Sequence, residues 1–222
     1  MTGAPLINVT DACYTIGSRT LWRGLNLEVE PAEMVAITGP SGAGKTTLLN
    51  CIGLIDRFTA GRLSILNRDL SAPKESVARR FRRQELGYLF QDFALVEADS
   101  VIDNVRLALP PGTSRRDAVE KIRAALDVVG LSEKRRNIEK SKVYELSGGE
   151  QQRVALARLI VRNPRIILAD EPTASLDREN GEMTLRLMRL RAEAGAAVVV
   201  VSHDPWVVDH CDREFRIAME EN

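Results

Sequence analysis

The segment from Gly39 to Thr46 reads Gly-Pro-Ser-Gly-Ala-Gly-Lys-Thr, which is the pattern of a phosphate-binding loop. Its glycines can adopt positive φ angles, so backbone N–H groups can converge on phosphate oxygens without obstruction by side chains. The Lys45 ammonium would reach the β- and γ-phosphates of a nucleotide, and the Thr46 hydroxyl would bind a metal ion. The apolar residues 34–37 predict a buried strand before the loop, and residues 47–52 predict a helix after it. We therefore predict a nucleoside triphosphate site formed by Gly39, Pro40, Ser41, Gly42, Ala43, Gly44, Lys45, Thr46 and Thr47.

A pair of carboxylates, Asp170 and Glu171, follows the apolar run 166–169, which predicts a second buried strand. Open α/β sheets bind ligands at the carboxyl ends of their strands. Asp170 is suited to hold Mg²⁺, and Glu171 is suited to orient or deprotonate an attacking water. The alternative is a strand that ends in a solvated acidic turn, which would give these side chains no chemical role.

The segment Leu-Ser-Gly-Gly-Glu-Gln at positions 146–151 predicts a helix start, because Ser147 and Glu150 have the spacing of a capping box. The predicted helix runs from Gly148 to about residue 162. Two glycines in its first turn each cost roughly 1 kcal/mol relative to alanine. Bare backbone at a helix N-terminus binds anions, so Ser147, Gly148 and Gly149 are suited to a second phosphate contact. A plain capped helix would explain Ser147 and Glu150 but not both glycines.

Four further residues are ambiguous when each is taken alone. His203 follows an apolar run that predicts a central strand, and Gln91 follows a short strand. Asp177 is suited to cap a helix that begins near residue 179, and Tyr14 lies on a predicted strand where it could simply pack.

Together these motifs identify a resemblance to ABC-type ATPases, the nucleotide-binding domains of ABC transporters, over essentially the whole chain. The resemblance implies that ATP and Mg²⁺ are bound. It implies catalytic roles for Glu171, His203 as the switch histidine and Gln91, and metal binding by Thr46, Gln91 and Asp170. It also implies nucleotide contacts from the segment Ser147, Gly148, Gly149 and Gln151, from Asp177 in the interface segment 175–177, and from Tyr14 stacked on adenine.

The expected fold is α/β: a P-loop NTPase core with a mixed sheet, an N-terminal antiparallel β-subdomain and an inserted α-helical subdomain. Antiparallel strands are predicted at 6–14, 21–29 and 61–66, and helical periodicity runs through 101–137. We expect one domain over 1–222, with its core at about 1–90 and 164–222 and the helical subdomain at about 91–163. The last strand is predicted at about 214–218, so we expect no regulatory C-terminal domain.

Charge and hydropathy argue against several classes of function. The chain has 31 Lys plus Arg and 31 Asp plus Glu among 222 residues, which gives no electrostatic case for nucleic acid binding. Residues 79–83 are rich in arginine and predict one solvated helical face. No apolar run approaches the roughly 20 residues that cross a bilayer, and residues 1–10 lack the apolar h-region of a signal peptide. The three cysteines lack metal-ligand spacing and are expected to be buried or half-buried thiols.

The resemblance implies a head-to-tail homodimer in which each Ser147 segment closes the other subunit's ATP site, and a separate integral membrane permease as partner. The protein would then sit peripherally on the cytoplasmic side of the cell membrane. Segments 87–95, 103–105 and 145–155 are most similar to the lipoprotein-release and macrolide-export branch, and especially to its bacteriocin-export group. Ala32-Glu33 departs from the usual Gly-Glu of the family and leaves that turn in question.

An exporter of peptides, lipoproteins or drug-like molecules is the favoured function. A cell-envelope or signalling module that transmits force without moving a solute is the alternative. Soluble relatives acting on nucleic acid or ribosomes usually carry two cassettes or a coiled coil, and this chain shows neither. Residues 92–99 contain apolar side chains in a predicted surface loop, and we expect them to dock a short helix of the permease.

Overall fold

The computed structural model describes residues 4–110, 112–131, 137–174 and 176–218, and its centre is a parallel sheet of five strands. The strand order is β6 (Leu86–Leu89), β7 (Ile166–Asp170), β8 (Ala197–Val201), β3 (Met34–Thr38) and β9 (Arg213–Arg216). All four neighbouring pairs are parallel. Strands β7 and β8 consist almost wholly of buried aliphatic residues, as expected for strands covered on both faces.

A second sheet is antiparallel, with the order β2 (Arg19–Val29), β1 (Ile7–Ile16), β4 (Ala60–Ile65) and β5 (Arg68–Asp69). It confirms the predicted N-terminal β-subdomain, although β1 and β2 extend further toward their hairpin turn than predicted. The pairing of β1 with β2 shifts register between Val9 and Thr15, which marks bulges that bend the hairpin.

The helices are α1 (Lys45–Ile52), α2 (Glu75–Glu85), α3 (Val101–Arg106), α4 (Arg115–Val128), α6 (Gly148–Arg162), α7 (Arg178–Glu193) and α8 (Pro205–Asp209), with short 3₁₀ turns at Ile138–Lys140 and Val143–Glu145. The periodicity predicted through 101–137 is interrupted between α3 and α4. Pro110 and Gly112, with a φ of 83°, lie in this break, and neither residue favours a continuous helix. Part of the predicted stretch, 132–136, lies outside the described residues. No helix among those described is long and apolar enough to cross a membrane.

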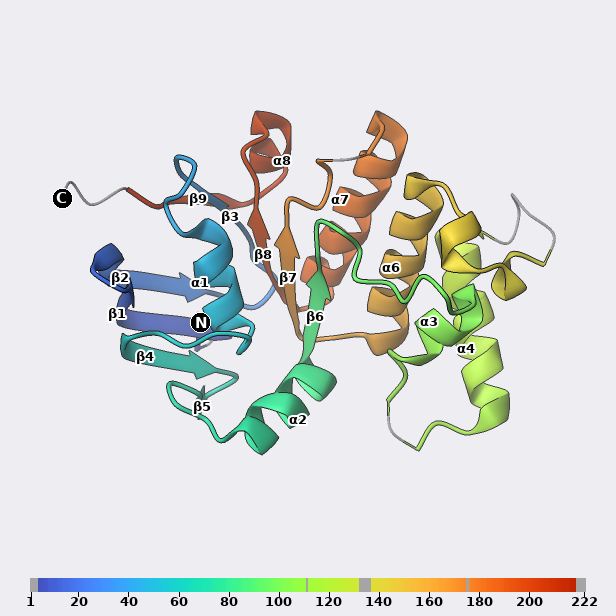
Figure 1. Ribbon diagram of the computed structural model, residues 1–222, viewed down its shortest axis with the longest axis horizontal. Helices are drawn as coiled ribbons and strands as arrows, with labels where there is room; N and C mark the ends of the chain where they lie inside the picture. Colours follow the sequence, from blue (N-terminus) through green and yellow to red (C-terminus); the bar gives the residue numbers. More distant parts are fainter. Residues whose placement is uncertain (1–3, 111, 132–136, 175, 219–222) are drawn as a thin grey trace.

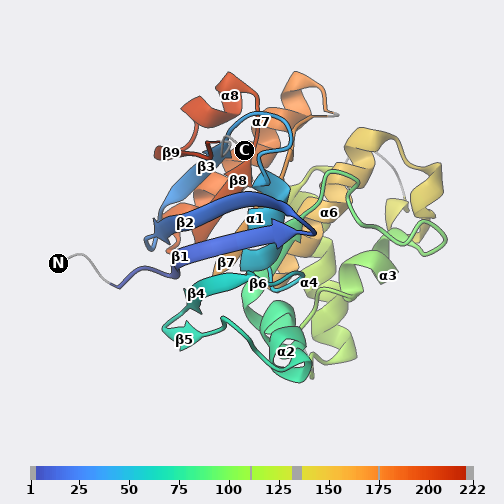
Figure 2. The same cartoon turned by 60° about the vertical axis from the view of Figure 1, so that its left-hand side comes forward.

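Two apolar clusters cover opposite faces of the parallel sheet. Alternate residues of β8 divide between them: Val199 and Val201 join the cluster that contains α1 and the antiparallel sheet, whereas Val198 and Val200 join α6, α7 and the helical subdomain. Figure 1 shows this layering, with β1, β2 and β4 on the left and α6 with α3 and α4 on the right. In Figure 2 the molecule is turned so that the antiparallel sheet comes forward in front of α1. The sheet is thereby held rigidly by both subdomains.

The arginine-rich face of α2 and the turn at Ala32 can be compared with what the sequence predicts. The arginine-rich face of α2 is not wholly solvated, because Phe81 is buried in the core and Arg82 donates to the Leu54 carbonyl and to Glu75. The turn at Ala32 keeps the geometry that a glycine would favour, with a φ of 64°. A left-handed conformation costs a non-glycine residue roughly 1 kcal/mol or more, which explains why glycine is usual there.

Candidate functional site

The predicted phosphate-binding loop connects the end of β3 to the start of α1 and is shaped by glycines that no other residue could replace. Gly39 has a φ of 146°, and a Cβ added there would lie 2.6 Å from the Ile217 carbonyl oxygen. Gly44 has a φ of 86°, and its Cβ would lie 2.7 Å from Trp22 Nε1. The tight packing holds the backbone of the loop in one conformation, with α1 presenting its N-terminus at the loop, as an anion site requires.

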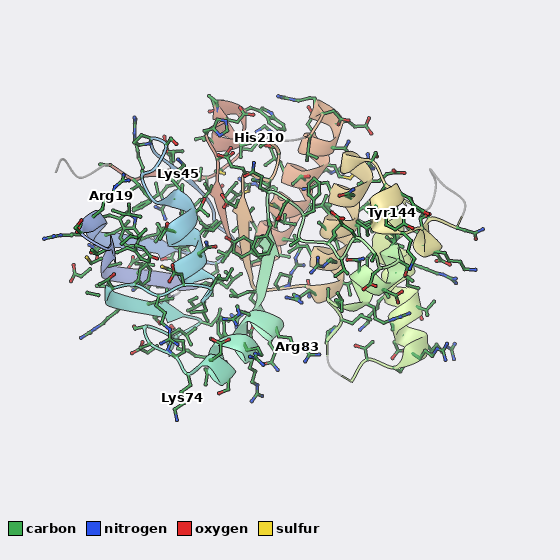
Figure 3. The ribbon with its side chains drawn as sticks, in the orientation of Figure 1. Arg19, Lys45, Lys74, Arg83, Tyr144 and His210 are labelled. Atoms are coloured by element: carbon green, nitrogen blue, oxygen red, sulfur yellow. The ribbon has the colours of Figure 1, made fainter. Side chains whose placement is uncertain are left out.

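Lys45 lies across this loop. Its Nζ donates to the carbonyl oxygens of Gly39, at 2.9 Å, and Pro40, at 3.0 Å. Figure 3 shows Lys45 on the upper side of the molecule, close to the hairpin that carries Arg19. The ammonium group is therefore already positioned at the phosphate-binding loop.

Asp170 brings the second predicted motif into contact with the first. The Thr46 hydroxyl donates to Asp170 Oδ1 at 3.3 Å, so the end of β7 and the start of α1 meet at one edge of the sheet. Burial, opposed by the Thr46 hydrogen bond and assisted by the charge of Glu171, raises the pKa of the Asp170 carboxyl. A bound cation would favour the ionised form, so the pair fits a metal ion that is also held by phosphates. No group of three His, Cys, Asp or Glu side chains within the described residues could hold a metal without such help.

Glu171 is held by two groups at the end of β8. His203 Nδ1 lies 2.7 Å from Glu171 Oε1, and the Ser202 hydroxyl donates to Glu171 Oε2 at 3.2 Å. Glu171 has a φ of 45°, a conformation that is costly for a residue with a Cβ. Its carboxylate is largely shielded, whereas the His203 side chain is 76% exposed. One side of the Glu171 carboxylate thus faces the protein interior, and the His203 imidazole lies on its solvent side.

The Glu171 carboxylate raises the pKa of His203 above its ordinary value of 6.5, mainly through the hydrogen bond and secondarily through its charge. We expect Glu171→Gln to return the His203 pKa toward 6.5, measured by NMR titration of the imidazole Cε1–H. The chain has two histidines, so His210→Gln assigns the resonances. Because the folded pKa is the higher one, the pair stabilises the fold at pH below the unfolded pKa, and this contribution is lost as pH rises through the folded pKa. An unchanged His203 pKa in Glu171→Gln would contradict the contact.

Gln91 lies in an exposed turn two residues after β6. Leu89 pairs with Ala169, so the continuing chain carries Gln91 to the same edge of the sheet as the carboxylates. Its side chain forms no hydrogen bond with Thr46 or Asp170 among the described contacts. The structure thus places Gln91 at the same edge of the sheet as the carboxylates, without a hydrogen bond between its side chain and Thr46 or Asp170.

The segment before α6 forms the predicted capping box. Ser147 Oγ accepts from the Glu150 N–H at 3.3 Å, while Glu150 Oε2 accepts from the Ser147 N–H at 2.8 Å. Gln151 Nε2 donates to the Leu146 carbonyl at 3.2 Å and so steadies the segment rather than projecting freely.

The two glycines of this segment have different causes. A Cβ at Gly149 would lie 2.7 Å from Asn180 Nδ2, so close packing of α6 on α7 accounts for that glycine within the monomer. Around Gly148 nothing lies within 4 Å of the added Cβ. Packing thus explains Gly149 without a ligand, whereas Gly148 faces open space. The phosphate contacts of both glycines stay predictions.

Asp177 caps α7 and is tied to α6 through residues that the sequence did not single out. Its Oδ1 accepts from both the backbone N–H and the side-chain Nδ2 of Asn180, each at 2.8 Å. The buried Arg153 donates to Asn180 Oδ1 at 2.9 Å and to the Val129 carbonyl at 2.8 Å. This network joins the second turn of α6 to the first turn of α7. Ser175 of the predicted interface segment lies outside the described residues.

Tyr14, predicted to stack on adenine, is engaged elsewhere in the structure. Its hydroxyl donates to Asp56, which raises its pKa to about 12, and its ring packs on Trp22 with centroids 5.6 Å apart. Trp22, rather than Tyr14, contacts the phosphate-binding loop, at Gly44. The adenine role of Tyr14 stays a prediction.

The N-terminus of α6 and the phosphate-binding loop lie along the same edge of the molecule but on opposite sides of β8, β7 and β6 (Figure 1). No hydrogen bond connects the Ser147 segment to the loop within the described chain. One chain therefore carries the two predicted phosphate-binding elements without bringing them together.

Residues 22–174 match the model of the ABC transporter family. The chain belongs to this family. It is 41% identical over 197 residues to the lipoprotein-releasing system ATP-binding protein LolD of Nitratidesulfovibrio vulgaris, covering 88% of this chain and 83% of LolD. It is 35% identical over 222 residues to the macrolide export ATP-binding/permease protein MacB of Brucella melitensis, covering 98% of this chain but only 34% of MacB. These relatives confirm the predicted branch; the narrower bacteriocin-export group stays a prediction.

Solved structures agree with this family assignment. The dimeric ATP-binding cassette MJ0796 bound to ADP and Pi superposes with a TM-score of 0.85 at 32% identity, covering 97% of each chain. The curated MJ0796 protein of Methanocaldococcus jannaschii is 38% identical over 203 residues, covering 90% of this chain and 86% of that protein. The P-loop fold is thereby confirmed, and the chain is an ATP-binding ATPase domain of the ABC type.

Proposed function

We propose that this chain hydrolyses ATP as the peripheral subunit of a membrane exporter of peptides, lipoproteins or drug-like molecules, on the cytoplasmic side of the cell membrane. The observation that carries the proposal is the meeting of three strand ends: the Lys45 loop after β3, Asp170 and Glu171 after β7, and His203 after β8. Similarity to LolD and MacB supports the transport role.

Each side chain has a chemical task in this proposal. Lys45 and the loop N–H groups bind the ATP phosphates, while Thr46, Asp170 and Gln91 hold Mg²⁺, which supplies charge neutralisation at the phosphates when bound. Glu171 orients the attacking water and accepts its proton, since its carboxylate is fixed by Ser202 and His203. His203 is exposed enough to contact the nucleotide from the same edge of the sheet.

A head-to-tail homodimer completes the site. The open backbone at Gly148 and the Ser147 hydroxyl of one subunit would bind the phosphates held by the other subunit's Lys45. Asp177 would lie near the same interface because it caps α7 beside α6. Two equivalent contacts related by a twofold axis close such a dimer. The dimeric MJ0796 cassette, with 97% coverage of both chains, supports this arrangement.

Docking of the permease by segment 92–99 requires a correction of which side chains are available. Phe93 and Leu95 are half-buried and pack on the helical-subdomain cluster, so they do not form a free apolar surface. Val96 is 44% exposed, and its backbone N–H and C=O are both bonded to the side chain of the fully buried Asn104. The segment is thus a rigid platform that presents Val96.

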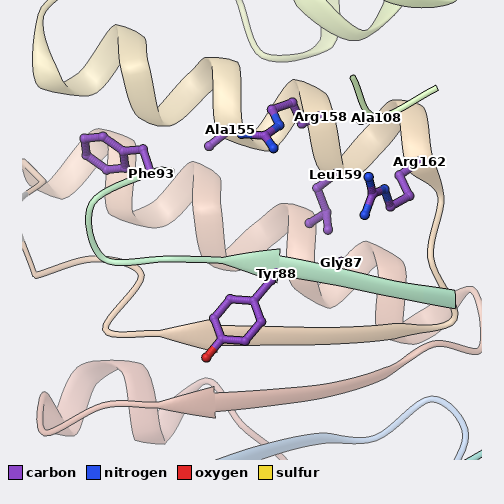
Figure 4. A pocket seen from close by; sticks show the side chains of 8 residues that line it. All are labelled: Gly87, Tyr88, Phe93, Ala108, Ala155, Arg158, Leu159 and Arg162. Carbon is purple, nitrogen blue, oxygen red and sulfur yellow. The ribbon is translucent and has the colours of Figure 1, made fainter. Parts of the chain in front are cut away.

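A small cavity beside this platform adds a charge preference. Gly87, Phe93, Ala155 and Leu159 contribute to its wall, and Arg158 and Arg162 project from α6 into the same region (Figure 4). Burial lowers the pKa of both guanidinium groups, and no carboxylate among the described residues forms an ion pair with either. A permease segment that carries a carboxylate beside an apolar side chain would complement this face.

The proposal is tested by co-expressing the chain with the membrane protein encoded next to it and measuring co-purification and ATPase activity. Val96→Glu is expected to leave basal ATPase activity unchanged while reducing permease stimulation at least about fivefold, because an added carboxylate desolvates poorly at an apolar contact. Val128→Glu on α4, where the native side chain is 59% exposed, is the matched control. Equal effects of both substitutions would place the docking surface elsewhere, and absence of basal activity in the wild type would overturn the ATPase proposal itself.

A further inference from the structure

The first residue of β2 lies against the phosphate-binding loop. Arg19 Nη2 donates to the Gly42 carbonyl oxygen at 3.4 Å, and a Cβ added at Gly42 would lie 3.8 Å from the same nitrogen. Two residues further along β2, the Leu21 side chain lies against Gly44, where an added Cβ would be 2.9 Å from Leu21 Cδ1. Leu21 is the extra residue of β2 at a register shift, because Tyr14 pairs with Trp22 and Thr15 pairs with Thr20. The start of β2 therefore covers the loop, with an apolar contact at Gly44 and a guanidinium at Gly42.

The hairpin that carries Arg19 is shaped to reach the loop. Arg19 pairs with Ile16 across the turn, which contains Gly17 with a φ of 59°. The register shift at Leu21 bends this end of the hairpin, and Trp22, the next residue of β2, packs on Gly44. Leu21 and Trp22 are buried and fix this end of β2, so the exposed Arg19 side chain extends from an anchored backbone.

Arg19 has donors to spare. A guanidinium carries five N–H donors. One bond to a neutral carbonyl at 3.4 Å leaves most of these donors for another acceptor. Within the described part of the chain, no carboxylate forms an ion pair with Arg19. A nucleotide carries several negative charges, and the loop itself supplies a single cation, Lys45.

We propose that Arg19 is a second cationic contact for the nucleotide phosphates, delivered from the β1–β2 hairpin to the loop at Gly42. The inference rests on the proposed ATP site. Its chemistry is a charge-assisted hydrogen bond from guanidinium to a phosphate oxygen, which favours ADP and ATP over uncharged adenosine. Arg19 thus sets affinity and phosphate selectivity and does not take part in water activation.

The test is a binding measurement on the purified chain, with fluorescently labelled ATP as probe and unlabelled ATP, ADP and adenosine as competitors. Arg19→Met is expected to weaken ATP and ADP binding about five- to tenfold and to leave adenosine binding unchanged. Arg19→Lys should restore most of the affinity. Arg116→Met, which removes an exposed arginine from α4, is the control and should change nothing. The ATP affinity of Arg19→Met should also fall less steeply with added salt than that of the wild type, because one phosphate contact is gone.

The outcomes separate the two proposals. Loss of ATP binding in Lys45→Ala together with full affinity in Arg19→Met would retain the ATP site and overturn the role of Arg19. An equal loss for ATP and adenosine in Arg19→Met would also overturn it, since a structural defect of the hairpin does not discriminate by charge. Wild-type chain that binds no ATP would overturn the proposed function.

Discussion

Replacement of Glu171 by glutamine is expected to retain ATP binding while ATP turnover falls by about 100-fold or more, the usual contribution of a positioned general base. The amide is nearly isosteric and can still accept from Ser202, so the loop that follows β7 should keep its conformation. It cannot accept a proton from water. ATP bound at two composite sites would then persist, and the variant should elute as a dimer in size-exclusion chromatography with Mg-ATP.

Lys45→Ala provides the contrast, because its loss removes the cation that lies across the phosphate-binding loop. We expect weakened ATP binding and monomeric elution at the same nucleotide concentration. A Glu171→Gln chain that elutes strictly as a monomer at high protein and ATP would contradict both the role of Glu171 and the ATP-bound dimer. Retention of wild-type ATP turnover by Glu171→Gln would contradict only the role of Glu171.

The parts of the site that sequence could predict are those in which local chemistry dictates local structure. The glycines around Lys45, the apolar strand before Asp170 and the capping box at Ser147 each specify their own backbone, and all three have the predicted form. The meeting of Thr46 with Asp170, 124 residues apart, followed from the rule that parallel strands present their carboxyl ends at one edge.

The parts of the site that the sequence did not predict depend on packing between distant segments, which no motif or spacing in the sequence relates to one another. The close approach of Asn180 to Gly149 follows from the packing of α7 against α6, which no spacing in the sequence encodes. The contact of Arg19 with Gly42 depends on a register shift at Leu21 of β2, and Tyr14 turns toward Asp56 in the same hairpin region. Phe93 packs inward because the helical subdomain offers an apolar cluster, although its neighbours in the chain are polar or exposed.

Ser147→Arg is expected to abolish hydrolysis while ATP binding to the isolated subunit stays within about twofold of the wild type. The Ser147 segment makes no contact with the phosphate-binding loop of its own chain, so the defect belongs to the partner's site. Loss of the cap itself should cost about 1 kcal/mol of stability, which Ser147→Ala measures without adding bulk. ATPase activity, nucleotide affinity and thermal melting are compared for both variants.

The glycine pair supplies an independent control for this trans arrangement. Gly148→Ala adds a methyl group where the monomer has open space, so this variant should melt normally yet lose hydrolysis. Gly149→Ala should destabilise the fold through Asn180, which Arg153 and Asp177 hold in place.

Mixing Ser147→Arg with Lys45→Ala chains gives a heterodimer in which one composite site carries both lesions and the other carries none. Some activity should therefore return on mixing two inactive proteins. Loss of ATP binding by monomeric Ser147→Arg, with unaltered melting, would show that the segment acts on its own chain's nucleotide and would refute the head-to-tail dimer.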